Sequence, residues 1–140
     1  MKAFLIKTAL TVEPAGIDIA PTNLDDNIKE ILECQRHYVA KIFKVEDKFF
    51  RVFYVYESDP DKYVFYNNNL KATLIFRDCD VFFKDYPFDE IKGNVLIESL
   101  DGKFDIFNDD IQAYLMKNLK KKALFFSGKN KNSAIFYRQN

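Results

Sequence analysis

The sequence is poor in the residues that build disulfide frameworks and metal centres. It contains two cysteines, Cys34 and Cys79, and a single histidine, His37. Two cysteines so far apart exclude a disulfide framework, and we therefore expect a reduced, cytoplasmic protein. One histidine without a cysteine at ligand spacing does not supply a zinc site, so His37 is interpreted as a surface or capping residue.

Glycine and proline are also scarce, with four of each among 140 residues. So few glycines leave little room for a glycine-rich phosphate loop, and we expect no cofactor. No apolar run approaches the roughly 20 residues that a membrane helix needs, so no membrane association is expected. The N-terminal MKAFLIKTALTVEPAG has the outline of a signal peptide, but Lys7 interrupts its apolar run and its alternation favours a strand over residues 2–12.

Apolar and aromatic residues, by contrast, are abundant. Hydrophobic residues make up 48% of the chain, which includes 15 Phe and 8 Tyr. This content argues against disorder, and the length is sufficient to bury a core. Nothing in the composition marks a domain linker, so residues 1–140 are expected to form a single domain.

The stretch from His37 to Phe83 is the aromatic and β-branched centre of the sequence. Residues 48–57 alternate along a strand with both faces largely apolar, which predicts a central strand covered on both sides. Residues 37–45 fit either a helix or a strand, and their β-branched and aromatic content favours a strand. Further strands are predicted at residues 63–66, 70–76 and 81–83, on both sides of an Asp101-Gly102 turn, and around a turn at 128–132.

Two helices are predicted from apolar spacing and from acidic residues at their first turns. The first begins near Asn23 or Asp25 and ends near residue 36. The second is capped by Asn108 and ends in a run of lysines, where the helix dipole favours cations. The predicted fold is therefore α+β: a twisted antiparallel sheet of about seven to nine short strands with two helices packed on it.

Charge is balanced overall but unevenly distributed along the chain. From residue 111 onward there are seven bases and no acid, so residues 1–110 carry 14 bases and 21 acids, a net charge of −7. This distribution predicts two candidate binding surfaces, one acidic and one basic.

The acidic candidate surface consists of carboxylates in predicted turns. Carboxylates gathered with exposed tyrosines are suited to docking a basic protein partner. The simpler interpretation, that these are solvated turn residues, stays open. The candidate residues are Asp59, Asp61, Asp78, Asp80, Asp85, Asp89 and Glu90.

The basic candidate surface lies in the C-terminal segment, where lysines alternate with aromatic residues. Bases with aromatics are typical of single-stranded nucleic-acid binding, although the same rings fit a core. The candidate residues are Lys120, Lys121, Lys122, Lys129, Lys131 and Arg138.

Catalytic patterns are short and unspecific. Asp78 and Asp80 flank Cys79 with a spacing that could hold Mg²⁺, but turn chemistry explains the same triplet. Glu46-Asp47-Lys48 has the E-x-K spacing of some metal-dependent nucleases, yet it falls in a predicted turn. An enzyme with a dispersed carboxylate site is therefore kept as an alternative, and the balance leans against an enzyme.

The expected function is that of a small non-enzymatic binding or inhibitor protein that acts through protein–protein contacts. Immunity proteins and phage or mobile-element antagonists are examples of this class. The first alternative is a nucleic-acid-binding module that uses the basic C-terminal segment, and the second is the carboxylate enzyme.

Overall fold

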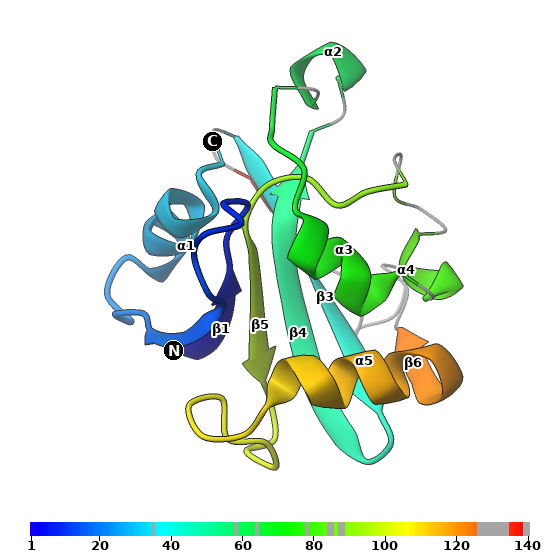
Figure 1. Ribbon diagram of the computed structural model, residues 1–140. Helices are drawn as coiled ribbons and strands as arrows, with labels where there is room; N and C mark the ends of the chain where they lie inside the picture. Colours follow the sequence, from blue (N-terminus) through cyan, green and yellow to red (C-terminus); the bar gives the residue numbers. More distant parts are fainter. Residues whose placement is uncertain are drawn as a thin grey trace.

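The computed structural model is an α+β structure with helices on both faces of one antiparallel sheet (Figure 1). It describes residues 1–34, 36–57, 59–63, 65–77, 79–83, 86, 89–125 and 135–138, and of these it gives only the backbone at 60, 80, 81, 120–125 and 135–138. The predicted α+β class and antiparallel sheet are confirmed. Within the described ranges, no helix combines the length and the apolar character needed to cross a membrane.

Five neighbouring strands in the order β2-β1-β5-β4-β3 form the body of the sheet, and β6 and β7 extend it along the outer edge of β3. The longest ladder joins the nine-residue strands β3 and β4. The strands are β1 (Lys2–Ile6), β2 (Ala15–Asp18), β3 (His37–Val45), β4 (Lys48–Tyr56), β5 (Val95–Ser99), β6 (Ala123–Phe125) and β7 (Ile135–Arg138).

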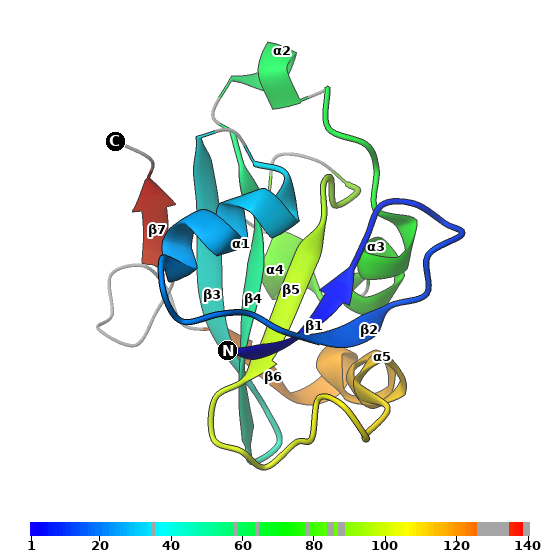
Figure 2. The same ribbon diagram turned by 90° about the vertical axis from the view of Figure 1, so that its left-hand side faces the viewer.

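The helices form two layers (Figure 2). α1 (Leu24–Leu32) covers one face of the sheet, whereas α3 (Leu70–Phe76), α4 (Asp80–Phe83) and α5 (Ile111–Lys122) lie on the other. The single turn α2 (Pro60–Tyr63) stands beyond the upper end of β4 in both views.

β4 is shared by the two layers, as its apolar pattern predicted. Phe50, Val52 and Tyr54 face the layer that contains α3, α4 and α5. Phe53 and Val55 face α1. All five side chains are buried, so the prediction of a central strand covered on both sides is confirmed.

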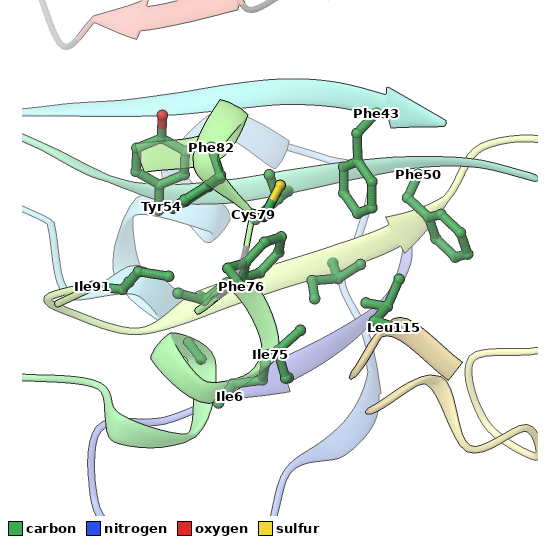
Figure 3. Close-up of a cluster of buried hydrophobic side chains, with 14 of the residues drawn as sticks. Ile6, Phe43, Phe50, Tyr54, Ile75, Phe76, Cys79, Phe82, Ile91 and Leu115 are labelled. Carbon is green, nitrogen blue, oxygen red and sulfur yellow. The ribbon is translucent and has the colours of Figure 1, made fainter. Parts of the chain in front are cut away.

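Seven of the 21 buried residues of the larger core are aromatic, and their rings contact one another. Phe76 of α3 stacks on Phe82 of α4 with ring centroids 4.6 Å apart, and Phe43 stacks on Phe50 at 5.4 Å. Figure 3 shows these helical side chains meeting the rings of β3 and β4, with Leu115 of α5 beside them. Such rings supply most of the apolar area that drives folding, and their burial leaves few of them for binding.

Three segments predicted as strands are helical or turn structure instead. Residues 70–76 form α3 and residues 81–83 lie in α4. In the predicted strand 63–66, Tyr63 is the last residue of α2, and the N–H groups of Phe65 and Tyr66 bond to the carbonyls of Lys62 and Tyr63 as in turns. In α3 only Ala72, Ile75 and Phe76 are buried, which is a helical spacing concealed by the β-favouring residues around it. The prediction of two helices is therefore wrong, because the described residues contain five.

The hairpin predicted at Asp101-Gly102 is also wrong. The turn itself forms, with Gly102 at φ 71°, but no strand follows it in the described residues 103–110. β5 instead pairs on both edges, so that Ile97 lies opposite Phe4 on one side and Val52 on the other. No edge of β5 is left for the predicted pairing with Ile106.

Both helices predicted from apolar stripes form, with shifted ends. α1 ends at Leu32 because its cap residue Glu33 takes a left-handed conformation, φ 55°. α5 begins at Ile111, and the carboxylate of Asp110, rather than Asn108, accepts a hydrogen bond from the N–H of Ala113 at 3.0 Å.

The N-terminal and C-terminal connections differ from expectation as well. β1 ends at Ile6, and β2 forms where a linker was expected. The predicted turn at 128–132 lies outside the described residues. Its two expected arms, β6 and β7, each pair with β3.

A buried lysine attaches α1 to the sheet. The side chain of Lys29 is 6% exposed, and its ammonium lies 2.9 Å from the carboxylate of Asp25. Asp25 also accepts a hydrogen bond from the hydroxyl of Tyr38 on β3, at 2.6 Å. Burial acts to raise the pKa of Asp25, but the hydrogen bonds from Tyr38 and Lys29 outweigh it and hold the pKa below its usual value of 3.8.

Replacing Asp25 with Asn should lower the free energy of unfolding by about 1–2 kcal/mol at neutral pH, because Lys29 would stay buried without its counter-charge. The pKa of Asp25 is lower in the folded state, so this stabilisation is present above 3.8 and is lost as the pH falls through the folded-state pKa. Urea denaturation of the wild type and Asp25→Asn at neutral and at strongly acidic pH measures the difference. Asp26→Asn, one residue along and exposed, is the control, with an expected change within about 0.5 kcal/mol; equal losses for the two variants would contradict the role of Asp25.

Candidate functional site: a cleft at the upper end of the sheet

A cleft of about 520 Å³ opens where β4 ends and β3 and β5 begin. Its walls include the C-terminal end of α1 and the segment that contains α2; Figures 1 and 2 show where these two elements lie. Four stretches that are distant in sequence contribute to its walls. The lining residues are Thr8, Leu32, Glu33, Arg36, Glu57, Lys62, Phe65, Tyr66, Asn67 and Gly93.

Carboxylates shape the turn above the cleft. The N–H of Asp59 donates to Oε1 of Glu57 at 3.2 Å, and the N–H of Asp61 donates to Oδ1 of Asp59 at 3.0 Å. Asp59 therefore occupies the capping position of α2, as the turn chemistry of the sequence indicated.

Phe65 is the most exposed large apolar side chain in the described part of the chain, at 84%. Its neighbours hold it in this position. Tyr63 is buried against Tyr86, with ring centroids 6.0 Å apart and the two hydroxyls hydrogen-bonded, and Tyr66 packs 6.0 Å from Tyr63. Burial raises the pKa of Tyr63, and the nearby Tyr86 raises it further, so the hydroxyl of Tyr63 remains protonated. Because the tyrosines on both sides of Phe65 are anchored inward, Phe65 faces solvent.

Gly93, one of the lining residues, is held by the carboxamide of Asn69, which is 0% exposed. Its Nδ2 donates to the carbonyl oxygens of Ile6 and Gly93, each at 2.9 Å. Its Oδ1 accepts from the N–H of Ala72 at 3.0 Å and caps α3. The prediction that residues 67–69 form a hairpin turn is therefore wrong: Asn69 joins the end of β1, the start of α3 and the approach to β5.

Asn69→Asp tests this junction with almost no change of shape. The variant replaces two N–H donors by a carboxylate that faces two carbonyl oxygens, so we expect a loss of about 3 kcal/mol or more at neutral pH. Asn68→Asp is the control, because Asn68 is exposed and its side chain accepts one bond, from Lys92 at 2.7 Å. Urea denaturation of both variants gives the comparison, and a similar cost for the two would contradict the role of Asn69.

Gly93 brings the backbone close to the sheet at the cleft wall. It has φ +82°, and a Cβ there would lie 2.9 Å from Cγ2 of Val55. The N–H of Gly93 also donates to the carbonyl of Asn67 at 2.8 Å. Glycine is required at this position by both conformation and space.

Two glycine-to-alanine variants separate these requirements. Gly102 has φ +71°, and a Cβ added there would meet nothing within 4 Å, so Gly102→Ala should cost only the left-handed strain, about 1 kcal/mol. Gly93→Ala should cost about 1–3 kcal/mol more than that, because the added methyl group crowds Val55. Thermal or urea unfolding measures both, and equal costs would show that the wall has room to relax.

Four of the acidic residues predicted from the sequence have described side chains, in two places. Asp59 and Asp61 lie in the α2 turn beside the cleft. Asp89 and Glu90 are exposed on the connection that leads from α4 to β5 (Figure 1). The first pair borders the cleft, whereas the second pair does not line it.

The other acidic candidates are Asp78 and Asp80, which flank Cys79 in the sequence, and Asp85; Cys79 itself is buried. α4 begins at Asp80, whose side chain is not described, and Asp78 and Asp85 lie outside the described residues. Among the side chains that are described, no group of three or more His, Cys, Asp or Glu residues is arranged to hold a metal ion.

The basic candidates are divided between the two ends of β3. Lys120, Lys121 and Lys122 end α5, which leads directly into β6 opposite Val45. Arg138 in β7 lies opposite His37, and eight residues of strand between His37 and Val45 span about 26 Å. The structure therefore does not place Arg138 beside the lysines of α5. Lys129 and Lys131 lie outside the described residues.

Glu46 and Asp47 form the turn between β3 and β4, and Lys48 is the first residue of β4. Glu46 accepts a hydrogen bond from the hydroxyl of Tyr114 at 2.8 Å, and Asp47 pairs with Lys48 at 3.1 Å. The E-x-K sequence therefore lies at a turn, as predicted, and its side chains make structural contacts there.

Exposed apolar side chains are concentrated in two segments of the chain, and one of them, Phe65, lines the cleft. Of the eight large apolar side chains exposed in the described residues, five lie in the segments 10–12 and 65–74. The ammonium of Lys71 in α3 donates to the carbonyl of Val12 at 2.7 Å and joins the two segments, which lie side by side in Figure 2. We call these five residues the Phe65 surface: Leu10, Val12, Phe65, Leu70 and Leu74.

Neither the Phe65 surface nor the deeper cleft residues were predicted from the sequence. Glu33 and Glu57 stand at the ends of α1 and β4, and their proximity depends on how those ends meet. Comparisons with protein-family models, with curated proteins and with solved structures returned no match.

Proposed function

We propose that this chain is a small binding protein that inhibits another protein through contacts at the Phe65 surface and the adjoining cleft. This proposal rests on five of the eight exposed large apolar side chains, which lie in two segments, 10–12 and 65–74, that the hydrogen bond from Lys71 to Val12 joins. Soluble proteins seldom expose apolar side chains together without a use, and an aromatic anchor beside a polar rim is typical of protein-binding sites.

The charge of the chain favours a basic partner. Residues 1–110 carry a net charge of −7, and Asp59 and Asp61 stand beside Phe65. Complementary charge speeds association and suppresses wrong partners, while the apolar anchor supplies affinity. An inhibitor of a basic enzyme, of the kind that immunity proteins and phage or mobile-element antagonists represent, is the form of this function that we propose.

The test is capture of a partner from an extract of the native cell, followed by purification of a complex of fixed stoichiometry. Phe65→Ala should weaken the affinity for this partner by about 30-fold or more, as expected of a central aromatic anchor. Met116→Ala is the control, because Met116 is also exposed but lies on α5 at the other end of the sheet. Asp61→Lys should slow association, and Asp26→Lys, which is exposed in the first turn of α1 and outside both the cleft and the Phe65 surface, should change it less.

Failure to isolate a stoichiometric complex would contradict the proposal. Equal losses for Phe65→Ala and Met116→Ala would contradict the assignment to the Phe65 surface.

A further inference from the structure

Glu57 is a buried carboxylate without a cationic partner. The residue is 9% exposed, yet it lines the cleft. Its Oε1 accepts the backbone N–H of Asp59, and no ion pair to Glu57 is present within the described residues. Withdrawing a carboxylate from water is costly unless a cation or several hydrogen bonds compensate. The cleft therefore offers an unused acceptor to a positively charged group.

The end of α1 adds negative potential to the same cleft. Leu32 is the last residue of α1 and Glu33 is its cap, and both line the cleft. The C-terminal end of a helix carries a partial negative charge that favours cations. Glu57, Glu33 and the end of α1 thus reach the cleft from different elements with the same sign.

Two bases also line the cleft, and both are exposed at its rim. Arg36 precedes β3 and Lys62 lies in α2. Neither forms an ion pair with Glu57 or Glu33 among the described residues. Since the rim carries the bases Arg36 and Lys62 beside the exposed Glu33, and the buried acceptor is acidic, the best-matched occupant carries a cation at its tip and an acceptor, such as a backbone carbonyl or a carboxylate, nearer its base.

The remaining walls suit the stem of such a side chain. Phe65 and Tyr66 present aromatic rings at the cleft, and such rings attract both aliphatic stems and cations. A volume of about 520 Å³ accommodates a long side chain together with its neighbouring backbone.

We infer that the cleft receives an arginine or lysine side chain of the protein partner, with Glu57 accepting its charged tip and Phe65 and Tyr66 contacting its stem. This inference rests on the proposed function, because it takes the cation to arrive on a protein bound at the Phe65 surface. It adds the chemistry of recognition: the inhibitor would hold its basic target by one inserted side chain.

A short peptide tests the cleft without the partner. Full-length ¹⁵N-labelled protein is titrated with acetyl-Gly-Arg-Gly-amide and with the same peptide carrying citrulline, which keeps the shape of arginine and removes its charge. We expect the arginine peptide to shift the amide resonances of Glu57, Tyr66 and Gly93. Citrulline should weaken this binding about tenfold or more, as loss of a charged hydrogen bond predicts.

Glu57→Gln should weaken binding of the arginine peptide by a similar factor. Gln keeps an oxygen for the N–H of Asp59, and the ¹⁵N spectrum of the variant verifies its fold. Glu13→Gln, exposed and outside the cleft, is the matched control and should bind as the wild type does. Glu57→Gln should also lower the affinity for the captured protein partner more than Glu13→Gln does.

The two proposals fail in distinguishable ways. Equal binding of the arginine and citrulline peptides, or unchanged binding in Glu57→Gln, overturns the cleft inference and leaves capture through Phe65 standing. A different result overturns the proposed function: the arginine peptide binds through Glu57, but the protein forms no complex that depends on Phe65. In that case the cation does not arrive on a protein partner, and the cleft is assigned to a free cationic small molecule.

Discussion

The buried carboxamide of Asn69 holds three parts of the chain in one arrangement. An amide side chain carries two donors and an acceptor, and here the donors meet the carbonyls of Ile6 and Gly93 while the acceptor meets the N–H of Ala72. The backbone N–H of Asn69 donates in addition to the carbonyl of Ile91 at 2.7 Å. Neither a hydroxyl nor a carboxylate can satisfy this set of partners, so the end of β1, the start of α3 and the approach to β5 depend on one residue type.

The shape of the cleft depends on this junction and on the position of β4 between two layers of helices. Thr8 follows β1 and Gly93 precedes β5, so both are placed by the junction at Asn69. Glu57 lies two residues beyond Val55 and therefore on the face of β4 that α1 covers. The buried apolar side chains of that face lie next to the cleft, and this explains why the carboxylate of Glu57 is so little exposed.

The parts of the fold that could be predicted from sequence are those with a strong one-dimensional pattern. β4 was recognisable because its apolar residues alternate on both faces, and α1 and α5 because their apolar stripes are long. α3 was not, because a helix of seven residues buries only three side chains, and its Thr, Ile and Phe residues are typical of a strand. In such a short segment the contacts with the sheet decide the conformation, and no local pattern records them.

The same limit applies to the site. Asp59 and Asp61 could be placed in a turn because Pro60 and the carboxylates have local preferences. The outward position of Phe65 could not be predicted, because it depends on Tyr63 reaching Tyr86 over a separation of 23 residues.

The cleft is assembled from segments that span residues 8 to 93, and this has a consequence for the life of the protein in the cell. A partner that recognises such an assembled surface binds the folded chain and not the unfolded one, so binding draws the folding equilibrium toward the native state. Unfolded chains are continuously removed by proteases, whereas bound chains are withdrawn from that pool. If the chain is the inhibitor that we propose, its abundance would then follow the abundance of its target, with no need for a separate control of its synthesis.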